Sequence, residues 1–159
     1  MNPTGPVTPR ILVQSEPLDV AAETERLTIG RTDIGALVAF TGLCRDEAGT
    51  LAALELEHYP GMAEDAIGGI AAEAAARWPL HGLSIVHRYG RIIPGEPIVL
   101  VLTASSHRQA AFEAASFVMD YMKTRAPFWK KEHRADGTTG DWVEAKAGDG
   151  QAAGRWQDQ

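Results

Sequence analysis

The stretch Phe117–Glu132, FVMDYMKTRAPFWKKE, holds the residue types best suited to chemistry in this chain of 159 residues. Two lysines, Lys123 and Lys130, stand on either side of Pro127. Proline has no N–H to donate and drives the residue before it towards extended geometry, so the helix predicted for the first half of the stretch ends here. Lys123 then lies near a helix C-terminus and Lys130 on an extended segment. A chain that doubles back at this point can bring both ammonium groups to one pocket.

A lysine that acts as a nucleophile or as a general acid or base needs a lowered pKa, which a neighbouring cation or the exclusion of water supplies. Arg125 and Lys130 are cationic neighbours of Lys123. Phe128 and Trp129 are apolar enough to exclude water and to anchor the returning chain. We therefore predict the reactive centre here. The alternative is a structural role, in which the positive charge of Lys123 stabilises the helix C-terminus by its interaction with the helix dipole.

Three further residues are candidates for contact with an anion. His107 and Arg108 fall in the first turn of a predicted helix, where free N–H groups and the positive end of the dipole attract anions and Arg108 adds a bidentate donor. Arg45 begins a loop directly after an apolar strand, and loops at strand ends often carry binding groups. The alternatives are simple solvent exposure for His107 and Arg108, and a surface ion pair with Asp46, Glu47 or another acid for Arg45.

Other kinds of site are not indicated. The histidines lack a metal-ligand spacing, so no metal is predicted, and there is neither a glycine-rich phosphate loop nor a G-x-S-x-G motif. Cys44 is the single cysteine, which excludes an internal disulfide. A lone cysteine that ends an apolar strand is more often buried and inert than reactive. His87, in an alternating strand, is more often structural than catalytic.

The charge is distributed unevenly along the chain. Its formal net charge is −6, with 45% hydrophobic and 23% charged residues, as in a soluble globular protein. Residues 123–134 nevertheless hold five Lys or Arg against one acid. A cationic patch on an acidic body indicates a defined anionic ligand, although a solvated basic face is the alternative. The acidic total disfavours nucleic acid and acidic membrane surfaces as partners.

The remaining patterns predict one α+β domain, a largely antiparallel sheet with helices packed on it. Strands are expected at 10–14, 36–43, 51–58, 83–89, 98–105 and 142–145, and helices at 19–27, 62–78 and 106–123. The strand at 51–58 is expected to return antiparallel to that at 36–43, in which Gly42 marks a bulge or a close backbone approach. Asp19 is a candidate N-cap, and Ser106 with Gln109 has the spacing of a capping box.

The domain is expected to span residues 10–146, between a flexible arm at 1–9 and a mobile tail at 147–159. No apolar run reaches the roughly 20 residues of a membrane helix. The N-terminus, MNPTGPVTPR, lacks the apolar core of a secretion signal, so a cytoplasmic location is expected.

Several ordered blocks together resemble a known family. They are FTGLCRD at 40–46, LELEHYPGM at 54–62, RWPL at 77–80, VHRYGRIIPGE at 86–96, SSHRQAAFEA at 105–114 and MDYMKTRAPFWKKE at 119–132. These blocks closely resemble the large, catalytic subunit of molybdopterin synthase over roughly residues 10–146, and K-T-R-A-P-F-W-K is the most specific of the motifs.

The resemblance implies an α/β hammerhead fold and a homodimer at the centre of a heterotetramer. Each end would bind a small ubiquitin-like subunit whose C-terminal Gly-Gly carries a thiocarboxylate. That tail would enter a pocket and donate sulfur to cyclic pyranopterin monophosphate, and two transfers would form the dithiolene of molybdopterin, with no cofactor required.

Motif matching also assigns residues. Lys123 and Lys130 match the two key lysines of the family, and Arg45, His107 and Arg108 match its anion-contacting groups, with Arg108 near the substrate phosphate. We add Arg125, within the signature, as a further substrate-binding residue. Two other functions stay open: a non-catalytic pterin- or phosphate-binding protein of the same fold, and a scaffold that docks the ubiquitin-like partner by adding its tail beside a sheet edge.

Overall fold

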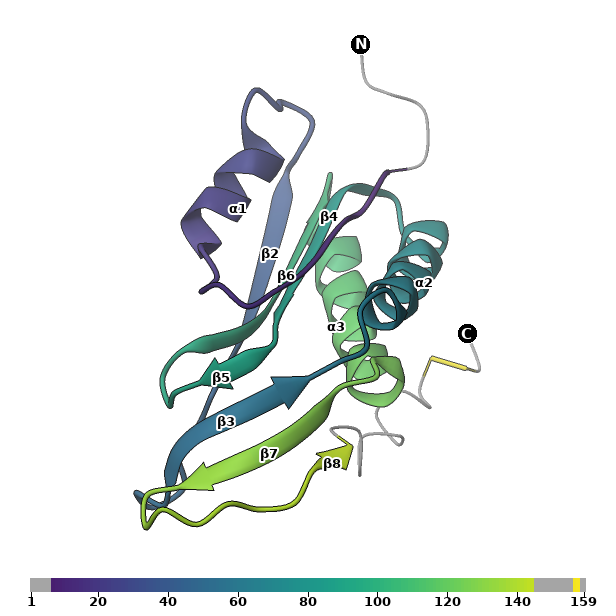
Figure 1. The fold of residues 1–159 in the computed structure, drawn as a ribbon. Coiled ribbons are helices and arrows are strands. Elements are labelled where there is room, and N and C mark those ends of the chain that lie inside the picture. The colour runs from purple at the N-terminus through teal and green to yellow at the C-terminus, as the bar shows by residue number, and fades with distance from the viewer. Residues whose placement is uncertain (1–6, 145–155, 158–159) are drawn as a thin grey trace.

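A computed structural model describes residues 7–144 and 156–157 of the chain. Its elements follow one another in the order drawn in Figure 1. They are β1 (Arg10–Gln14), α1 (Val20–Thr28), β2 (Ala36–Leu43), β3 (Leu51–Glu57), α2 (Met62–Arg77), β4 (Leu80–Arg88), β5 (Gly90–Ile92), β6 (Pro97–Ser105), α3 (Arg108–Arg125), β7 (Trp129–Arg134) and β8 (Val143–Glu144).

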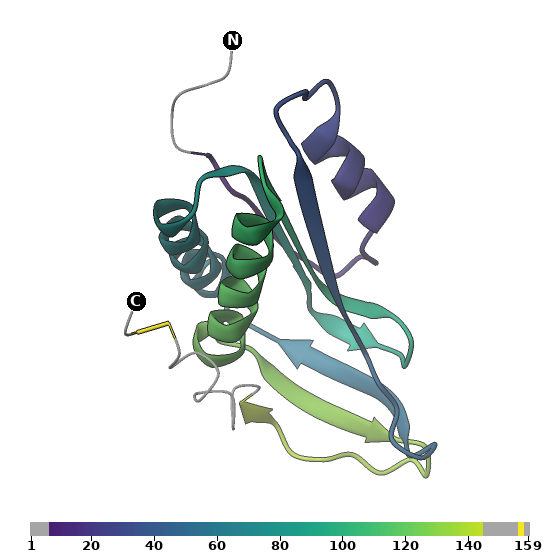
Figure 2. The same cartoon turned by 180° about the vertical axis from the view of Figure 1, so that it is seen from behind.

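These strands form two four-stranded sheets rather than one. The first sheet has the order β1-β4-β6-β2 and the second has the order β5-β3-β7-β8. Among the named strand pairs, β1 and β4 are parallel and the others are antiparallel. Helices α2 and α3 lie side by side on one face of the first sheet, and α1 lies on the other (Figures 1 and 2). The predicted α+β class is confirmed.

The first sheet is buried on both faces, and one of its two central strands, β6, is apolar without a break from Ile98 to Leu102. In β6, Val99 and Val101 face α2 and α3 and belong to the main core, which is built around Phe117. Leu100 and Leu102 point to the opposite face, where they pack towards α1. Alternate residues of a strand point to opposite faces, so a continuous apolar run is what a sheet covered on both sides requires.

The pairing predicted for the third strand was wrong. β3 does not return along β2 but belongs to the second sheet, where it pairs with β5 and β7. The alternation LELE shows that one face is buried, as Leu56 is, but it does not identify the neighbouring strand. The three-residue strand β5 was not predicted, because so short a segment carries no periodicity.

The turn signals were partly correct. Asp19 caps α1, since its Oδ1 accepts from the N–H of Ala22 at 2.9 Å. Gly42 marks both features expected of it: the register of β2 against β6 shifts directly after it, and a Cβ there would lie 2.8 Å from Cγ1 of Val99. The capping box at Ser106 was wrong, because α3 begins at Arg108 with His107 as its N-cap.

The predicted arm and tail fall mostly outside the described residues. Trp156 is described, and it is buried against the main core, in contact with residues of α2 and α3. Its ring stands edge-on to Trp78 at 5.5 Å, its Nε1 donates to Oδ2 of Asp120 at 2.6 Å, and its carbonyl accepts from Arg77 at 3.0 Å. In the described parts of the chain, no helix is long and apolar enough to span a membrane.

We predict that Trp156 contributes to the stability of the domain. Trp156→Ala should lower the free energy of unfolding by about 2–4 kcal/mol, since it removes a buried ring and the hydrogen bond to Asp120. Trp142→Ala is the matched control, because the Trp142 side chain is 42% exposed, and it should cost less than about 1 kcal/mol. Urea unfolding measures both; equal small losses would show that Trp156 does not anchor this part of the chain.

Candidate active site

Lys123 and Lys130 line the same cavity, of about 190 Å³. The chain reverses between them as predicted: α3 ends where the N–H of Ala126 donates to the carbonyl of Met122, and β7 starts at Trp129 after Pro127. Phe128 is buried at the bend. The other walls of the cavity are largely apolar, and include Phe40, Gly42, Leu54, Leu56, Met119 and Met122.

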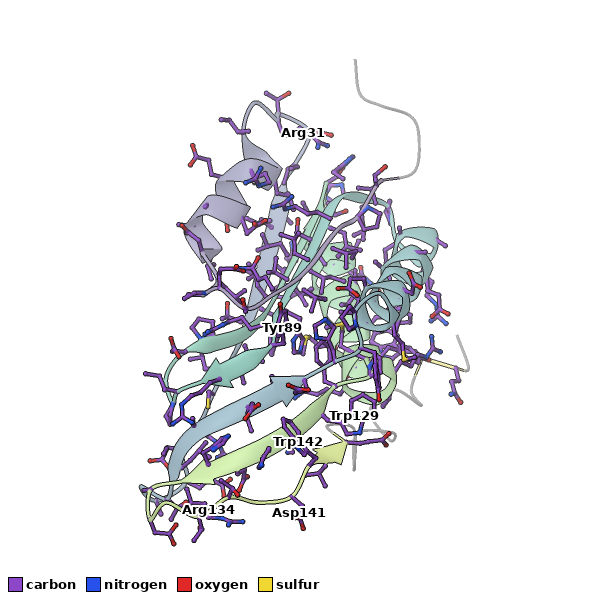
Figure 3. All side chains as sticks on the ribbon, viewed as in Figure 1. Arg31, Tyr89, Trp129, Arg134, Asp141 and Trp142 are labelled. Atoms are coloured by element: carbon purple, nitrogen blue, oxygen red, sulfur yellow. The ribbon has the colours of Figure 1, made fainter. Side chains whose placement is uncertain are left out.

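A second cavity, of about 390 Å³, shares both lysines with the first. Its lining is more strongly charged, because Arg45 and Arg134 contribute two more cations and Glu47 and Glu132 two anions. The lysines therefore stand where an apolar cavity and a polar cavity meet. Arg134 lies at the far end of β7 from α3 (Figure 3).

The alternation of β7 selects which cations reach the site. Lys130, paired with Leu56, and Arg134 lie on the strand face that lines the cavities. Trp129 and Lys131 lie on the other face, where the ammonium of Lys131 is 5.7 Å from the ring centre of Trp142. Within the described residues, neither Lys123 nor Lys130 forms an ion pair, so two uncompensated positive charges face the cavities.

Two predicted site arginines have different surroundings. Arg45 lines the polar cavity, but its side chain is 80% exposed and donates to Glu47 at 2.7 Å. This is the surface ion pair that the sequence left as the alternative to anion binding. Arg125 lines neither lysine cavity. It donates to both carboxylate oxygens of Glu73 at 3.1 Å and stacks over Tyr121, so it ties α3 to α2.

His107 and Arg108 lie far from the lysines within one chain. They stand at the start of α3, and at about 1.5 Å of rise per residue Arg108 is about 22 Å from Lys123 along the helix. Both side chains are exposed. The structure thus brings together Lys123, Lys130 and Arg45, and leaves this pair at the other end of α3.

His87 belongs to the site, although its sequence context favoured a structural role. It lines the apolar cavity with Lys123, and its ring stacks on Phe128 with 3.9 Å between centroids. Desolvation lowers the pKa of His87 to about 4 against the opposing effect of the hydrogen bond to the Arg88 carbonyl, and the charge of Lys123 adds a smaller lowering. The ring is therefore neutral at pH 7. The stacking of His87 on Phe128 identifies it as a residue of the cavity, and this contact arises only in the folded structure.

Cys44 is buried, and burial raises the pKa of its thiol, with a smaller effect of the charge of Glu96. A buried thiol of raised pKa is a poor nucleophile, as expected from its place in the sequence. Among the described residues, no three His, Cys, Asp or Glu side chains gather as a metal-binding set.

Known proteins show the same fold and sequence pattern. A family model described as "MoaE protein" matches residues 13–125. The chain belongs to the MoaE protein family. It is 67% identical over 149 residues to the molybdopterin synthase catalytic subunit of Mesorhizobium japonicum, covering 94% of each chain.

Solved structures agree with this membership. The MoaE protein of Burkholderia ambifaria superimposes with a TM-score of 0.82 at 48% identity, covering 94% of this chain and 98% of that one. Molybdopterin synthase from Staphylococcus aureus gives 0.75 at 32% identity, covering 83% and 95%. The predicted family is confirmed, and with it an enzyme that transfers sulfur to form the dithiolene of molybdopterin.

The neutral state of His87 gives this MoaE-family chain a predictable response to acid. A free histidine titrates near 6.5, so between that pH and about 4 the unfolded chain takes up a proton that the folded chain does not. The stability contribution is therefore complete above pH 6.5 and falls as the pH approaches 4, by up to about 3 kcal/mol.

Replacement of the ring should remove this part of the response. His87→Gln should flatten the decline of unfolding free energy between about pH 6.5 and pH 4, measured by urea unfolding at several pH values. His107→Gln, at an exposed position, is the control and should leave the decline as it is. A His87→Gln protein with an unaltered decline would contradict the assignment.

Proposed function

We propose that this chain accepts sulfur from the C-terminal thiocarboxylate of a small ubiquitin-like carrier and delivers it, in the cytoplasm, to cyclic pyranopterin monophosphate. Two such transfers form the dithiolene of molybdopterin. The main support is the position of Lys123 and Lys130, which form no ion pair within the described residues and stand at the junction of an apolar and a polar cavity.

The apolar cavity suits the Gly-Gly tail of the carrier. Glycine has no side chain, so a tail that ends in two glycines can pass between close walls that a larger residue would not enter. Gly42 forms part of this wall, where a Cβ has no room beside Val99. A tail inserted here would bring its terminal thiocarboxylate to Lys123 and Lys130, whose charges offset that of the sulfur-bearing group.

The polar cavity suits the substrate. Its cations, Lys123, Lys130, Arg45 and Arg134, provide charge-assisted donors for a cyclic phosphate, and its volume is about twice that of the apolar cavity. The substrate and the thiocarboxylate would then approach the lysines from two sides. Such an arrangement brings the donor sulfur to the acceptor carbons without releasing either into water.

The chemistry needs proton transfer at two points: the opening of the cyclic phosphate and the loss of water from the pterin side chain. Lys123, at the end of a rigid helix, is our principal acid, base or covalent participant. Lys130, on the facing strand, would stabilise the negative charge that develops on the leaving oxygen. Neutral His87 beside Lys123 adds no competing positive charge to the apolar cavity at pH 7.

A homodimer would complete the site. His107 and Arg108 match anion-contacting residues of the family but lie about 22 Å from Lys123 in their own chain. They can act at a lysine site if a second copy supplies them. Exposed apolar side chains near this end of the molecule, such as Phe112 on α3, are suited to a contact between copies. With one carrier per copy, the assembly is a heterotetramer.

We predict that Lys123→Ala abolishes product formation while the carrier still binds. The purified protein is mixed with cyclic pyranopterin monophosphate and thiocarboxylated carrier, and the dithiolene product is followed by mass spectrometry. Loss of the acid or base should lower turnover by about 10²-fold or more.

Lys131→Ala is the matched control, since Lys131 neighbours Lys130 on the opposite face of β7, and it should retain turnover. Full activity of Lys123→Ala would overturn the assignment of the lysine. A stable complex of the wild-type chain with carrier that gives no product would instead favour the scaffold function.

A mixed dimer tests the contribution of the second copy. If Arg108 acts on the partner chain, a dimer of one Lys123→Ala chain and one Arg108→Ala chain has both substitutions in one site. Its other site then contains neither substitution. Such dimers, purified with two different affinity tags, should keep about half of the wild-type turnover at a substrate concentration below KM, where each parent homodimer has little. Inactive mixed dimers would show that Arg108 acts within its own chain.

A further inference from the structure

A chain of four polar side chains lies at the N-terminal end of α3, outside the lysine site. Arg31 donates from its Nε and one terminal nitrogen to the two carboxylate oxygens of Asp33 at 2.9 and 2.8 Å. His81 Nδ1 lies 3.2 Å from Asp33, and His81 Nε2 lies 2.7 Å from Oγ of Ser106. Figure 3 places Arg31 at the opposite end of the molecule from Arg134.

The charge of Asp33 orients the ring of His81. The hydrogen bonds from Arg31 hold the pKa of Asp33 at about 2, so its carboxylate is anionic. This carboxylate lies beside Nδ1 of His81, and the other ring nitrogen, Nε2, points towards Ser106. The hydrogen bond between Nε2 and the Ser106 hydroxyl therefore holds that oxygen towards β4.

This contact changes where α3 begins. Ser106 and Gln109 have the spacing of a capping box, in which Ser106 would be the N-cap and His107 the first helical residue. Instead His107 is the N-cap, with extended backbone angles of φ −132° and ψ 154°, and no side chain caps the helix. The helix thus starts one residue later than its own sequence favours.

The backbone before His107 is held in place from two sides. The N–H of Gly35 donates to the carbonyl of Ser105 at 3.0 Å, and a Cβ on Gly35 would collide with the carbonyl oxygen of Ser106. The hydroxyl of Ser105 donates to the carbonyl of Pro79 at 2.8 Å. His107 follows directly on this fixed segment, and its extended backbone is the last step before the helix.

We propose that Asp33 and His81 are positioning residues, which hold the Ser106 hydroxyl on β4 and so keep His107 extended and Arg108 at the first helical position. In that geometry the two side chains project from the end of α3 towards the anion of the second copy's substrate. This inference rests on the proposed function, in which His107 and Arg108 contact that anion. Neither Asp33 nor His81 touches the substrate.

Three variants of the full-length chain test the positioning. His81→Phe keeps a ring but loses both nitrogens, which frees Ser106 to cap the helix. The KM for cyclic pyranopterin monophosphate should rise about tenfold, because one charge-assisted contact with the substrate is lost. The kcat should stay within about twofold of wild type. Ser106→Ala alone should stay near wild type, since alanine is a poor N-cap.

The double variant separates positioning from general damage. His81→Phe with Ser106→Ala has no hydroxyl to cap the helix, so its KM should return towards the wild-type value. If His81 only supports the fold, the double variant will be as impaired as His81→Phe or more so, and the proposal is overturned. Should His81→Phe not fold, His81→Ala and its double variant are measured in the same way.

Amide hydrogen exchange provides a readout that needs no turnover. In ¹⁵N-labelled His81→Phe protein, the N–H of Arg108 or Gln109 should exchange about tenfold more slowly than in wild type, and the double variant should reverse this. Unchanged exchange in His81→Phe would refute control of the helix start by His81. A wild-type chain without synthase activity would instead refute the proposed function, and the exchange result would still decide the role of His81.

Discussion

The reversal of the chain at Pro127 is the constraint on which the site depends. Proline cannot continue the hydrogen bonding of α3, and the residue before it, Ala126, takes up extended geometry with its N–H still bonded to Met122. The chain then leaves the helix as β7 and runs along β3. Without this reversal, Lys123 and Lys130 would lie about two turns apart on one helix, and no cavity would form between them.

Each of the two sheets positions one side of this reversal. The first sheet is covered by helices on both faces, so its apolar strands form a rigid body against which α3 is packed through Phe117, Val118 and Tyr121. The second sheet carries β7 and takes its position from β3. One lysine therefore comes from the rigid body and the other from the second sheet, and the cavities occupy the junction between them.

Helix α3 also separates two groups of cations. Its C-terminal end carries Lys123 and, through Arg125 and Glu73, a connection to α2. Its N-terminal end carries His107 and Arg108, next to the hydrogen bonds of Asp33 and His81. Since the helix holds these ends about 22 Å apart, the cations at both ends of α3 in a single chain cannot contact one small substrate. The homodimer proposed above would bring the two groups to one substrate from two copies of the chain.

The sequence by itself determined most of the elements and the two candidate lysines. The positions of the helices, the N-cap Asp19, the close approach at Gly42 and the break at Pro127 are local properties, set by side-chain periodicity and by backbone geometry that a few neighbouring residues dictate. Ordered motifs around Lys123 and Lys130 were specific enough to indicate the family. Local patterns of this kind do not depend on what the chain meets elsewhere.

The tertiary structure alone decided how these elements combine. The partner of β3 depends on contacts far along the chain, because alternation marks a buried face and not the strand beside it. Ser106 lost its capping role to His81, and His87 gained its place at the cavity through stacking on Phe128, both between residues at least 25 positions apart. Long-range contacts outweigh a local preference when they satisfy a polar group or bury a ring, and their identity is settled only once the chain has folded.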